Sequence, residues 1–311
     1  MPPKKKAATT LALSRLKVLA AGDEAPYRGA VLELLDTGDR LAREAALQAL
    51  TERPLSGMRD RLRALYLEID GEGEKRDPAA HLRTLIAKLL VQIEDVRDTD
   101  IGIRAADTHE MVNGTDGTAN LRSFGLRLIA VTNPDMLPYV AVEHVNDYSE
   151  FSPEPANTAL QLLAGSGNQL PVYQWLVSQN APEPALIESA VELLTDAPSA
   201  LLARLLRRIT REAIARRDEP LLTRLAETIV ERELEDAYSA VESMFHAAIS
   251  KELHGYLALL LAGTDREPLL AILERQIESD IRRRGAILDA LRVRTTPRQE
   301  AILKRWETDR A

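Results

Sequence analysis

Four arginines recur at helical spacing beyond the middle of the chain: Arg204, Arg207, Arg208 and Arg211. Positions i, i+3, i+4 and i+7 fall on one face of an α-helix, so these side chains should form one stripe. Guanidinium groups bind phosphates and carboxylates through paired hydrogen bonds. The stripe could therefore bind phosphates or an acidic peptide.

The same arginines also have a purely structural interpretation. The acidic stretch 218–236 follows directly, and its carboxylates include Glu227, Glu231, Glu233, Glu235 and Asp236. Charge-rich helix faces of opposite sign often lie together at the surface of a protein. We expect the arginines to pair with these acids or to face solvent.

Three aromatic residues form a second candidate binding face: Tyr139, Tyr173 and Trp175. They fall inside the internal repeats described below. Aromatic residues at repeat positions usually belong to the core, and we expect that here. The alternative is a concave surface that presents them to a partner, because binding surfaces favour Tyr and Trp.

The residues that usually carry catalysis are absent or poorly spaced. The chain has no cysteine and five histidines, and His109-Glu110 is not followed by the second histidine of a zinc-binding helix. The acid-rich stretch 94–100 lacks the glycine and glutamate of a calcium loop. The segment 113–117 lacks the Gly-Lys pair of a phosphate loop, and turn chemistry explains it. We predict no catalytic residue, no metal ligand and no cofactor, and we favour a non-enzyme.

Composition narrows the class of partner. The net charge of −8 argues against a dedicated nucleic-acid-binding protein, although it does not exclude nucleic acid. The apolar runs are too short to cross a membrane. With no cysteine and no apolar leader after Lys4–Lys6, we expect a cytoplasmic protein.

Helical periodicity dominates the sequence, and strand-like alternation is nearly absent. Glycine and proline interrupt the pattern at intervals of roughly 12–20 residues, which suits helices joined by tight turns. Three helix starts carry a capping side chain before proline: Asp77-Pro78, Ser152-Pro153 and Thr296-Pro297. Thr296 and Gln299 also have the spacing of a capping box.

Internal repeats give the strongest indication of fold. The segment that begins at Phe124 aligns without gaps with the segment that begins at Thr158, and a third copy begins near Ala190. A small residue, Gly125 or Ala159, should let two helices approach closely, while leucines fill the layer between them. The alignment predicts that Leu128, Leu162 and Leu193 are equivalent and buried. A repeat of this length cannot bury its apolar face alone, so it must stack on its neighbours.

The segment 34–50 resembles a HEAT repeat. In that pattern a helix ends in Leu-Leu, aspartates fill the turn, and an arginine precedes an alanine-rich helix. The matching residues are Leu34, Leu35, Asp36, Asp39, Arg43, Ala45, Ala46, Ala49 and Leu50. The second copy keeps Asp116 and Arg122, and the third has Ala156 in place of the arginine. The resemblance implies that the aspartates and arginines are structural.

These observations predict an all-α fold, a right-handed α-solenoid of stacked antiparallel helical pairs. We expect a disordered basic tail over 1–10 and a single solenoid domain over 11–311. Its clearest repeats should lie at about 30–50 and 116–206. A terminal cap helix should cover about 297–310, with one apolar face on the stack.

Such a fold suits an interaction scaffold that binds a protein or peptide. The alternative is a DNA-binding protein similar to bacterial alkylpurine DNA glycosylases, which are HEAT-like. There Trp175 and the arginine stripe would be the residues of interest. A third possibility is a HEAT-like lyase that attaches tetrapyrroles, for which the short repeat is the only hint.

Overall fold

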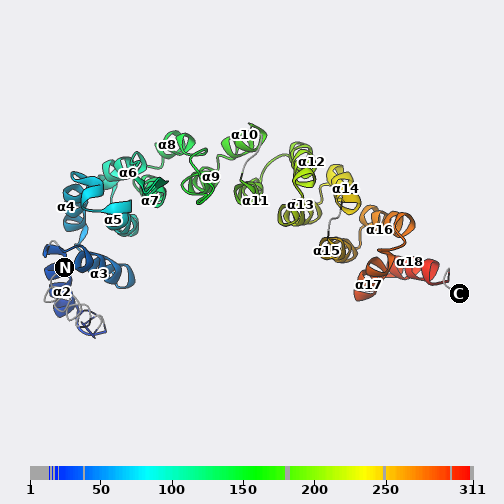
Figure 1. The fold of residues 1–311 in the computed structure, drawn as a ribbon, viewed down its shortest axis with the longest axis horizontal. Helices are drawn as coiled ribbons and strands as arrows, with labels where there is room; N and C mark the ends of the chain where they lie inside the picture. Colours follow the sequence, from blue (N-terminus) through cyan, green and yellow to red (C-terminus); the bar gives the residue numbers. More distant parts are fainter. Residues whose placement is uncertain are drawn as a thin grey trace. The chain divides into compact units, whose positions relative to one another are not determined.

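The computed structural model describes residues 14, 16, 18–19, 21–37, 39–178, 183–247, 250–294 and 296–308. This part of the chain is helical except for one short hairpin, and it confirms the all-α prediction. The chain divides into two compact units, Met1–Val172 and Tyr173–Ala311, whose elements are labelled in Figure 1. The predicted tail over 1–10 lies outside the described residues.

The first unit arranges its helices in two layers. Helices α3, α5, α7 and α9 pack on one another in chain order, and α2, α4, α6 and α8 each pack on the helix that follows. The bounds are α2 Glu24–Asp36, α3 Arg40–Glu52, α4 Arg59–Asp70, α5 His81–Ile93, α6 Thr99–Ala106, α7 Ala119–Thr132, α8 Leu137–Glu143 and α9 Ala156–Gly165. Short 3₁₀ turns, η1 Gly73–Lys75, η2 Pro78–Ala80 and η3 Val96–Asp98, lie between them.

The second unit repeats this alternation. Helices α11, α13, α15 and α17 pack in chain order, and α12, α14 and α16 form a second row. The bounds are α11 Pro184–Leu193, α12 Ser199–Arg216, α13 Glu219–Glu231, η4 Glu235–Ala237, α14 Tyr238–Ala247, α15 Lys251–Ala262, α16 Glu267–Ser279, α17 Arg284–Val293 and α18 Pro297–Thr308. Helix α10, Leu170–Ser178, contains the division between the units.

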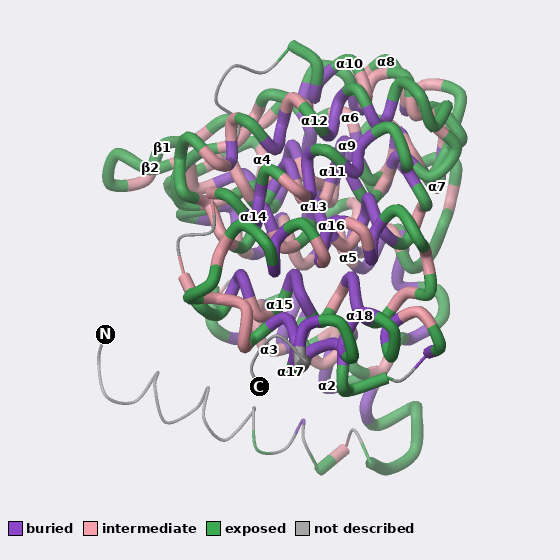
Figure 2. The backbone as a smooth tube through the Cα atoms, turned by 90° about the vertical axis from the view of Figure 1, so that its right-hand side faces the viewer, coloured by how far each residue is buried: buried purple, intermediate pink, exposed green. Residues whose placement is uncertain are grey.

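Leucine, isoleucine and alanine fill the space between the layers. The buried faces, purple in Figure 2, recur along almost every helix. Helix α12 is an example, because Leu202, Leu205, Leu206, Ile209 and Ala213 are all buried at helical spacing. Burial of each large apolar side chain stabilises the fold by roughly 1.5–3 kcal/mol. In the described residues, no helix is long and apolar enough to cross a membrane.

Helices α6 and α7 approach each other at two glycines. A Cβ atom on Gly125 would lie 2.5 Å from the Ala106 nitrogen and 2.8 Å from the Gly102 oxygen. A Cβ atom on Gly102 would lie 2.9 Å from an Ile129 side-chain carbon. The aligned Ala159 in α9 is fully buried. Close approach therefore explains the small residue at Gly125, as the repeat pattern predicted.

The repeat alignment holds for most, but not all, of the leucine positions. Leu126, Leu160 and Val191 are all fully buried, and so are Ile129, Leu163 and Leu194. Leu128 is also buried, but the aligned Leu162 and Leu193 are only half-buried, so that prediction was wrong for two of three positions. Leu128 is buried more deeply than Leu162 because more helices pack around its own helix. Helix α7 contacts α5, α6, α8 and α9, whereas α9 packs mainly on α7 and α8.

We predict that Leu163→Ala destabilises the protein by about 2–5 kcal/mol, the range for truncating a buried leucine. Leu162→Ala, one residue earlier, should cost less than half as much because its side chain already contacts solvent. Urea unfolding followed by circular dichroism compares the two variants directly. Equal losses would show that both leucines face the core.

Of the three predicted helix starts, Ser152-Pro153 was wrong, because α9 begins only at Ala156. Thr296 and Gln299 form the predicted capping box: the Thr296 amide donates to Gln299 Oε1 at 3.0 Å, and the Gln299 amide donates to Thr296 Oγ1 at 3.4 Å. Asp77 differs, because the 3₁₀ turn η2 intervenes. Its carboxylate instead accepts the amides of Leu82 and Arg83 in α5, at 2.9 and 3.0 Å.

The segment 113–117 forms part of a β-hairpin. Strands β1 (Met111–Val112) and β2 (Thr115–Asp116) pair antiparallel around Asn113 and Gly114. Both turn residues have positive φ, 52° and 83°, which an Asn-Gly pair accommodates. Turn chemistry thus explains the segment, as predicted. The strands are too short to show alternation in the sequence.

Arginines that flank a helix repeatedly bind carbonyl oxygens at or just beyond the end of an earlier helix. Carbonyl groups in the last turn of a helix have no partner within that helix, so a guanidinium group can satisfy them. The donors and acceptors are Arg53 to Gly22, Arg232 to Leu194, Arg266 to Val230 and Arg294 to Gly263, at 3.0, 2.5, 2.9 and 2.8 Å. The contacts tie together helices that lie about one repeat apart.

Candidate functional site

A pocket of about 370 Å³ lies between α12 and α14 in the second unit. Helix α12 contributes four residues and α14 contributes three. The lining residues are Arg204, Arg207, Thr210 and Arg211, and Ser239, Ala240 and Ser243. Three of the four arginines singled out in the sequence therefore meet at one pocket.

Amphipathicity of α12 positions these arginines. The apolar side of the helix packs inward, and Arg204, Arg207 and Arg211 are all exposed on the opposite side. Their spacing of three and four residues places the guanidinium stems one turn apart on that side. The predicted helix and its arginine face are thus present.

Arg208 does not belong to this face. Its guanidinium donates to the carbonyl oxygen of Val177 at 2.7 Å and to that of Leu176, at the end of α10. It also lies 3.7 Å from a carboxylate oxygen of Glu212. The prediction of a single four-arginine stripe was wrong for Arg208, because this side chain satisfies carbonyl groups of the preceding helix.

Two of the acids that were expected to neutralise the stripe, Glu227 and Glu233, have other partners. Glu227 accepts hydrogen bonds from Arg224 and Tyr256, and Glu233 pairs with Arg266. Among the described residues, no ion pair within 4.0 Å involves Arg204, Arg207 or Arg211. The expected pairing is absent for these three, and the other half of the expectation, exposure to solvent, holds.

Thr210 adds a buried hydroxyl to the pocket. Its side chain is only 1% exposed, and its Oγ1 has no hydrogen-bond partner in the described structure. Thr223 and Thr228 behave differently in α13, because each hydroxyl donates to the carbonyl oxygen four residues earlier, at 3.0 Å. A buried polar atom without a partner is costly, and such atoms are uncommon in folded proteins. Thr210 thus brings to the pocket lining a hydroxyl whose hydrogen-bonding capacity is unused within the described residues.

The chemistry of the described lining suits an anion. The lining holds three guanidinium groups and three hydroxyl groups, and it includes no carboxylate or histidine. Arginine stays protonated at every physiological pH, so the pocket is permanently cationic. Within the described ranges, no three histidine or acidic side chains gather closely enough to hold a metal ion.

The three aromatic candidates differ in their exposure. Trp175 is 3% exposed and belongs to the core, as expected, while Tyr173 is half-buried. Tyr139 is 78% exposed on α8, in the first unit. The expectation of a core position was wrong for Tyr139 because α8 buries only Leu137 and Ala141.

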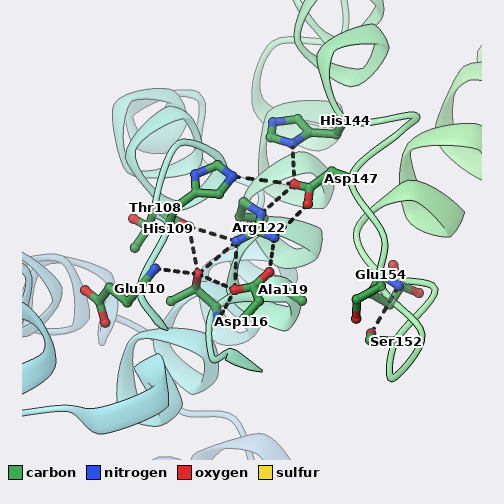
Figure 3. A network of polar contacts seen from close by, with 12 residues as sticks. Thr108, His109, Glu110, Asp116, Ala119, Arg122, His144, Asp147, Ser152 and Glu154 are labelled. Atoms are coloured by element: carbon green, nitrogen blue, oxygen red, sulfur yellow. Dashed lines mark hydrogen bonds and ion pairs between the residues drawn. The ribbon is translucent and has the colours of Figure 1, made fainter. Parts of the chain in front are cut away.

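A second polar cluster, around Arg122 in the first unit, is structural. Arg122 is fully buried and donates to Asp147 Oδ2 at 2.7 Å, to Thr118 Oγ1 at 2.8 Å and to the Thr108 carbonyl oxygen at 3.1 Å. It also binds Asp116 of the hairpin (Figure 3). The guanidinium group thus joins the hairpin, α7 and the segment that follows α8. This agrees with the structural role implied by the HEAT resemblance.

Hydrogen bonds to the carboxylate determine the protonation of Asp147. Burial raises its pKa, but the hydrogen bonds from His144 and Arg122 outweigh burial and bring the pKa below its ordinary value. Asp116 behaves in the same way: burial raises its pKa, but the hydrogen bonds from Arg122 and Thr118, together with the charge of Arg122, outweigh burial and lower the pKa. Both carboxylates are therefore charged partners of Arg122 at neutral pH.

Sequence reasoning missed the hydroxyl groups of the pocket. Thr210 follows Arg207 by three residues, so helical spacing alone would have placed it beside the arginines. Ser239 and Ser243 are four residues apart and share a face of α14. Only the packing of α14 on α12 could have connected them with the arginines. Comparison of the chain with protein-family models, with curated proteins and with solved structures gave no match.

Proposed function

We propose that the chain is a non-enzymatic interaction scaffold, a right-handed α-solenoid of HEAT-like helical pairs that binds a protein or peptide partner. Within each unit, alternate helices pack in chain order, which is how stacked helical pairs bury their apolar faces. The recurring arginine-to-carbonyl contacts support the same arrangement. A cytoplasmic location stays a prediction.

The observation that carries this proposal is the group of three arginines in the pocket between α12 and α14. Like charges three and four residues apart on a helix destabilise it by roughly 0.2–0.5 kcal/mol per pair. Arg204, Arg207 and Arg211 bear this cost with no carboxylate partner within the described residues. An acidic ligand would remove the repulsion, so a surface for an acidic partner explains the cluster.

A protein partner suits the rest of the unit better than DNA does. The 3₁₀ turn η4 packs on α12 and carries two exposed carboxylates, Glu235 and Asp236. They limit the cationic surface on that side to the pocket, which suits a short anionic group better than an extended phosphate backbone. Trp175 is buried and so is not available to stack on a base. Arg208 binds carbonyl oxygens of the protein itself. The net charge of −8 opposes nucleic acid as well.

Selection from a random peptide library on the purified protein tests this function. We expect peptides rich in Asp and Glu that bind with micromolar affinity. Binding should fall at least tenfold in the double variant Arg207→Gln, Arg211→Gln. A matched control, Arg40→Gln with Arg282→Gln, removes the same charge from exposed positions elsewhere and should bind as the wild type does.

Two other results would contradict the proposal. A duplex DNA that shifts in a gel at physiological salt, and no longer does so in the Arg207, Arg211 variant, would favour the DNA-binding alternative. A radius of gyration in solution of about 19–20 Å, the value for a compact globule of this length, would contradict the solenoid.

A further inference from the structure

We infer that the pocket between α12 and α14 is a site for a phosphoryl group, and that its ligand is a phosphorylated serine or threonine in the acidic partner segment. The inference rests on the proposed function, because it names the chemical group that the scaffold would recognise. It is carried by the combination of unpaired guanidinium groups with a buried, unpartnered hydroxyl.

Charge favours a phosphate over a carboxylate. A phosphorylated side chain carries about −1.5 to −2 charges at neutral pH and three acceptor oxygens, whereas a carboxylate carries one charge and two oxygens. Arg204, Arg207 and Arg211 supply three positive charges around one pocket. A single carboxylate would leave two of these charges without compensation, and a phosphate dianion leaves only one.

The arrangement of donors also fits a tetrahedral anion. Arg204 and Arg211 are seven residues apart, so their backbone positions are separated by about 10 Å along the axis of α12. Thr210, whose buried hydroxyl has no partner in the described structure, lines the same pocket, and Ser239 contributes a hydroxyl from α14. The Ser243 hydroxyl donates to the Ser239 carbonyl oxygen at 2.9 Å, so it can only accept a hydrogen bond from a ligand. Donors thus surround the pocket from two helices. A planar carboxylate can form both of its hydrogen bonds with the two parallel N–H groups of one guanidinium group. It would therefore leave the Thr210 hydroxyl without a partner.

The size of the pocket suits a phosphorylated residue within a peptide. Its volume of about 370 Å³ is at the low end of the ~300–1,000 Å³ typical of ligand pockets. Such a space admits the phosphoryl group and the side chain that carries it. A nucleic-acid backbone would instead have to continue along the surface, where Glu235 and Asp236 of η4 lie.

Phosphorus NMR of O-phospho-L-serine titrated with the full chain tests the site with a probe that needs no peptide sequence. We expect saturable binding in the millimolar range, weakened at least tenfold by Arg207→Gln with Arg211→Gln. Thr210→Val removes the hydroxyl with little change in shape and should weaken binding about three- to tenfold while leaving thermal stability unchanged or higher. The Arg40→Gln, Arg282→Gln control should bind as the wild type does.

The pH dependence separates a phosphate site from a general anion site. The second pKa of a phosphate monoester is about 6, so binding of phosphoserine should strengthen between pH 5.5 and 7.5 as the dianion forms. Sulfate keeps its charge over this range and should bind with constant affinity. It thereby controls for any pH-dependent change in the protein itself. The charged side chains on the elements that pack around α12 and α14 include Glu231 of α13, Glu235 and Asp236 of η4, Glu242 and His246 of α14, and Arg275 of α16.

The outcomes distinguish this inference from the proposed function. Acidic peptides selected from the library that bind through the arginines, combined with no phosphoserine binding, would overturn the phosphate site and leave the scaffold intact. Phosphoserine binding that is unchanged in the Arg207, Arg211 variant or in Thr210→Val would place the phosphate elsewhere and overturn the inference. Displacement of phosphoserine by duplex DNA, but not by a phosphopeptide, would also overturn it.

Discussion

Arg122→Ala should destabilise the first unit by about 3 kcal/mol. Removing one member of a buried ion pair typically costs about 3–5 kcal/mol, because the remaining charge loses its partner. We expect the low end of that range, since the side chains of Asp116 and Asp147 remain 27% and 25% exposed and water can partly solvate them. Urea unfolding monitored by circular dichroism measures the loss. Arg76→Ala, which breaks exposed ion pairs in the same unit, should cost less than about 1 kcal/mol.

Acid titration provides an independent check on the same cluster. The pKa values of Asp116 and Asp147 are lowered in the folded state, so these groups stabilise the fold above their unfolded pKa of about 3.9. That stabilisation is lost as the pH falls through the folded pKa values. The difference in stability between the wild type and Arg122→Ala should therefore shrink as the pH falls below about 4. An equal difference at pH 3 and pH 7 would show that Arg122 acts through packing alone.

Gly125→Ala should destabilise the protein by about 1–3 kcal/mol, even though alanine is the better helix former. The added methyl group would lie within 2.9 Å of backbone atoms of Ala105, Ala106 and Gly102, so α6 and α7 would have to separate. Overpacking of this kind typically costs about 1–3 kcal/mol. Backbone atoms cannot move aside as a flexible side chain can, so the upper part of this range applies.

Gly29→Ala is the matched control for this substitution. Gly29 lies within α2, and a Cβ atom there would meet nothing within 4 Å. The same change should therefore stabilise the protein by roughly 0.5–1 kcal/mol, because alanine loses less backbone entropy in a helix. If both substitutions stabilised the protein, the close approach of α6 and α7 would not exist in solution.

Local patterns in the sequence predicted local features of the structure well. Helical periodicity predicted the helices, and the capping residues predicted the Thr296 capping box. The terminal helix α18 begins at Pro297 as expected and buries Gln299, Ile302 and Leu303. These features depend on hydrogen bonds and side-chain spacing within a few residues. They are therefore readable without knowledge of the remaining fold.

The burial of a side chain by neighbouring helices was harder to predict from the sequence. The repeat alignment identified Ile129, Leu163 and Leu194 as equivalent, and all three are buried. It could not show that Leu162 and Leu193 lack the cover that Leu128 has. Exposure of one face of a helix depends on how many neighbours it meets, and a single repeat does not contain that information.

The candidate site shows the same division. The sequence by itself determined that Arg204, Arg207 and Arg211 share one face of a helix, because their spacing matches the helical period. Only the tertiary structure decided that Arg208 binds the end of α10 and that Glu227 and Glu233 have other partners. It alone decided that Ser239 and Ser243 meet the arginines beside Thr210. The physical reason is that charge pairing and pocket formation depend on distances between helices. Spacing along one helix does not fix those distances.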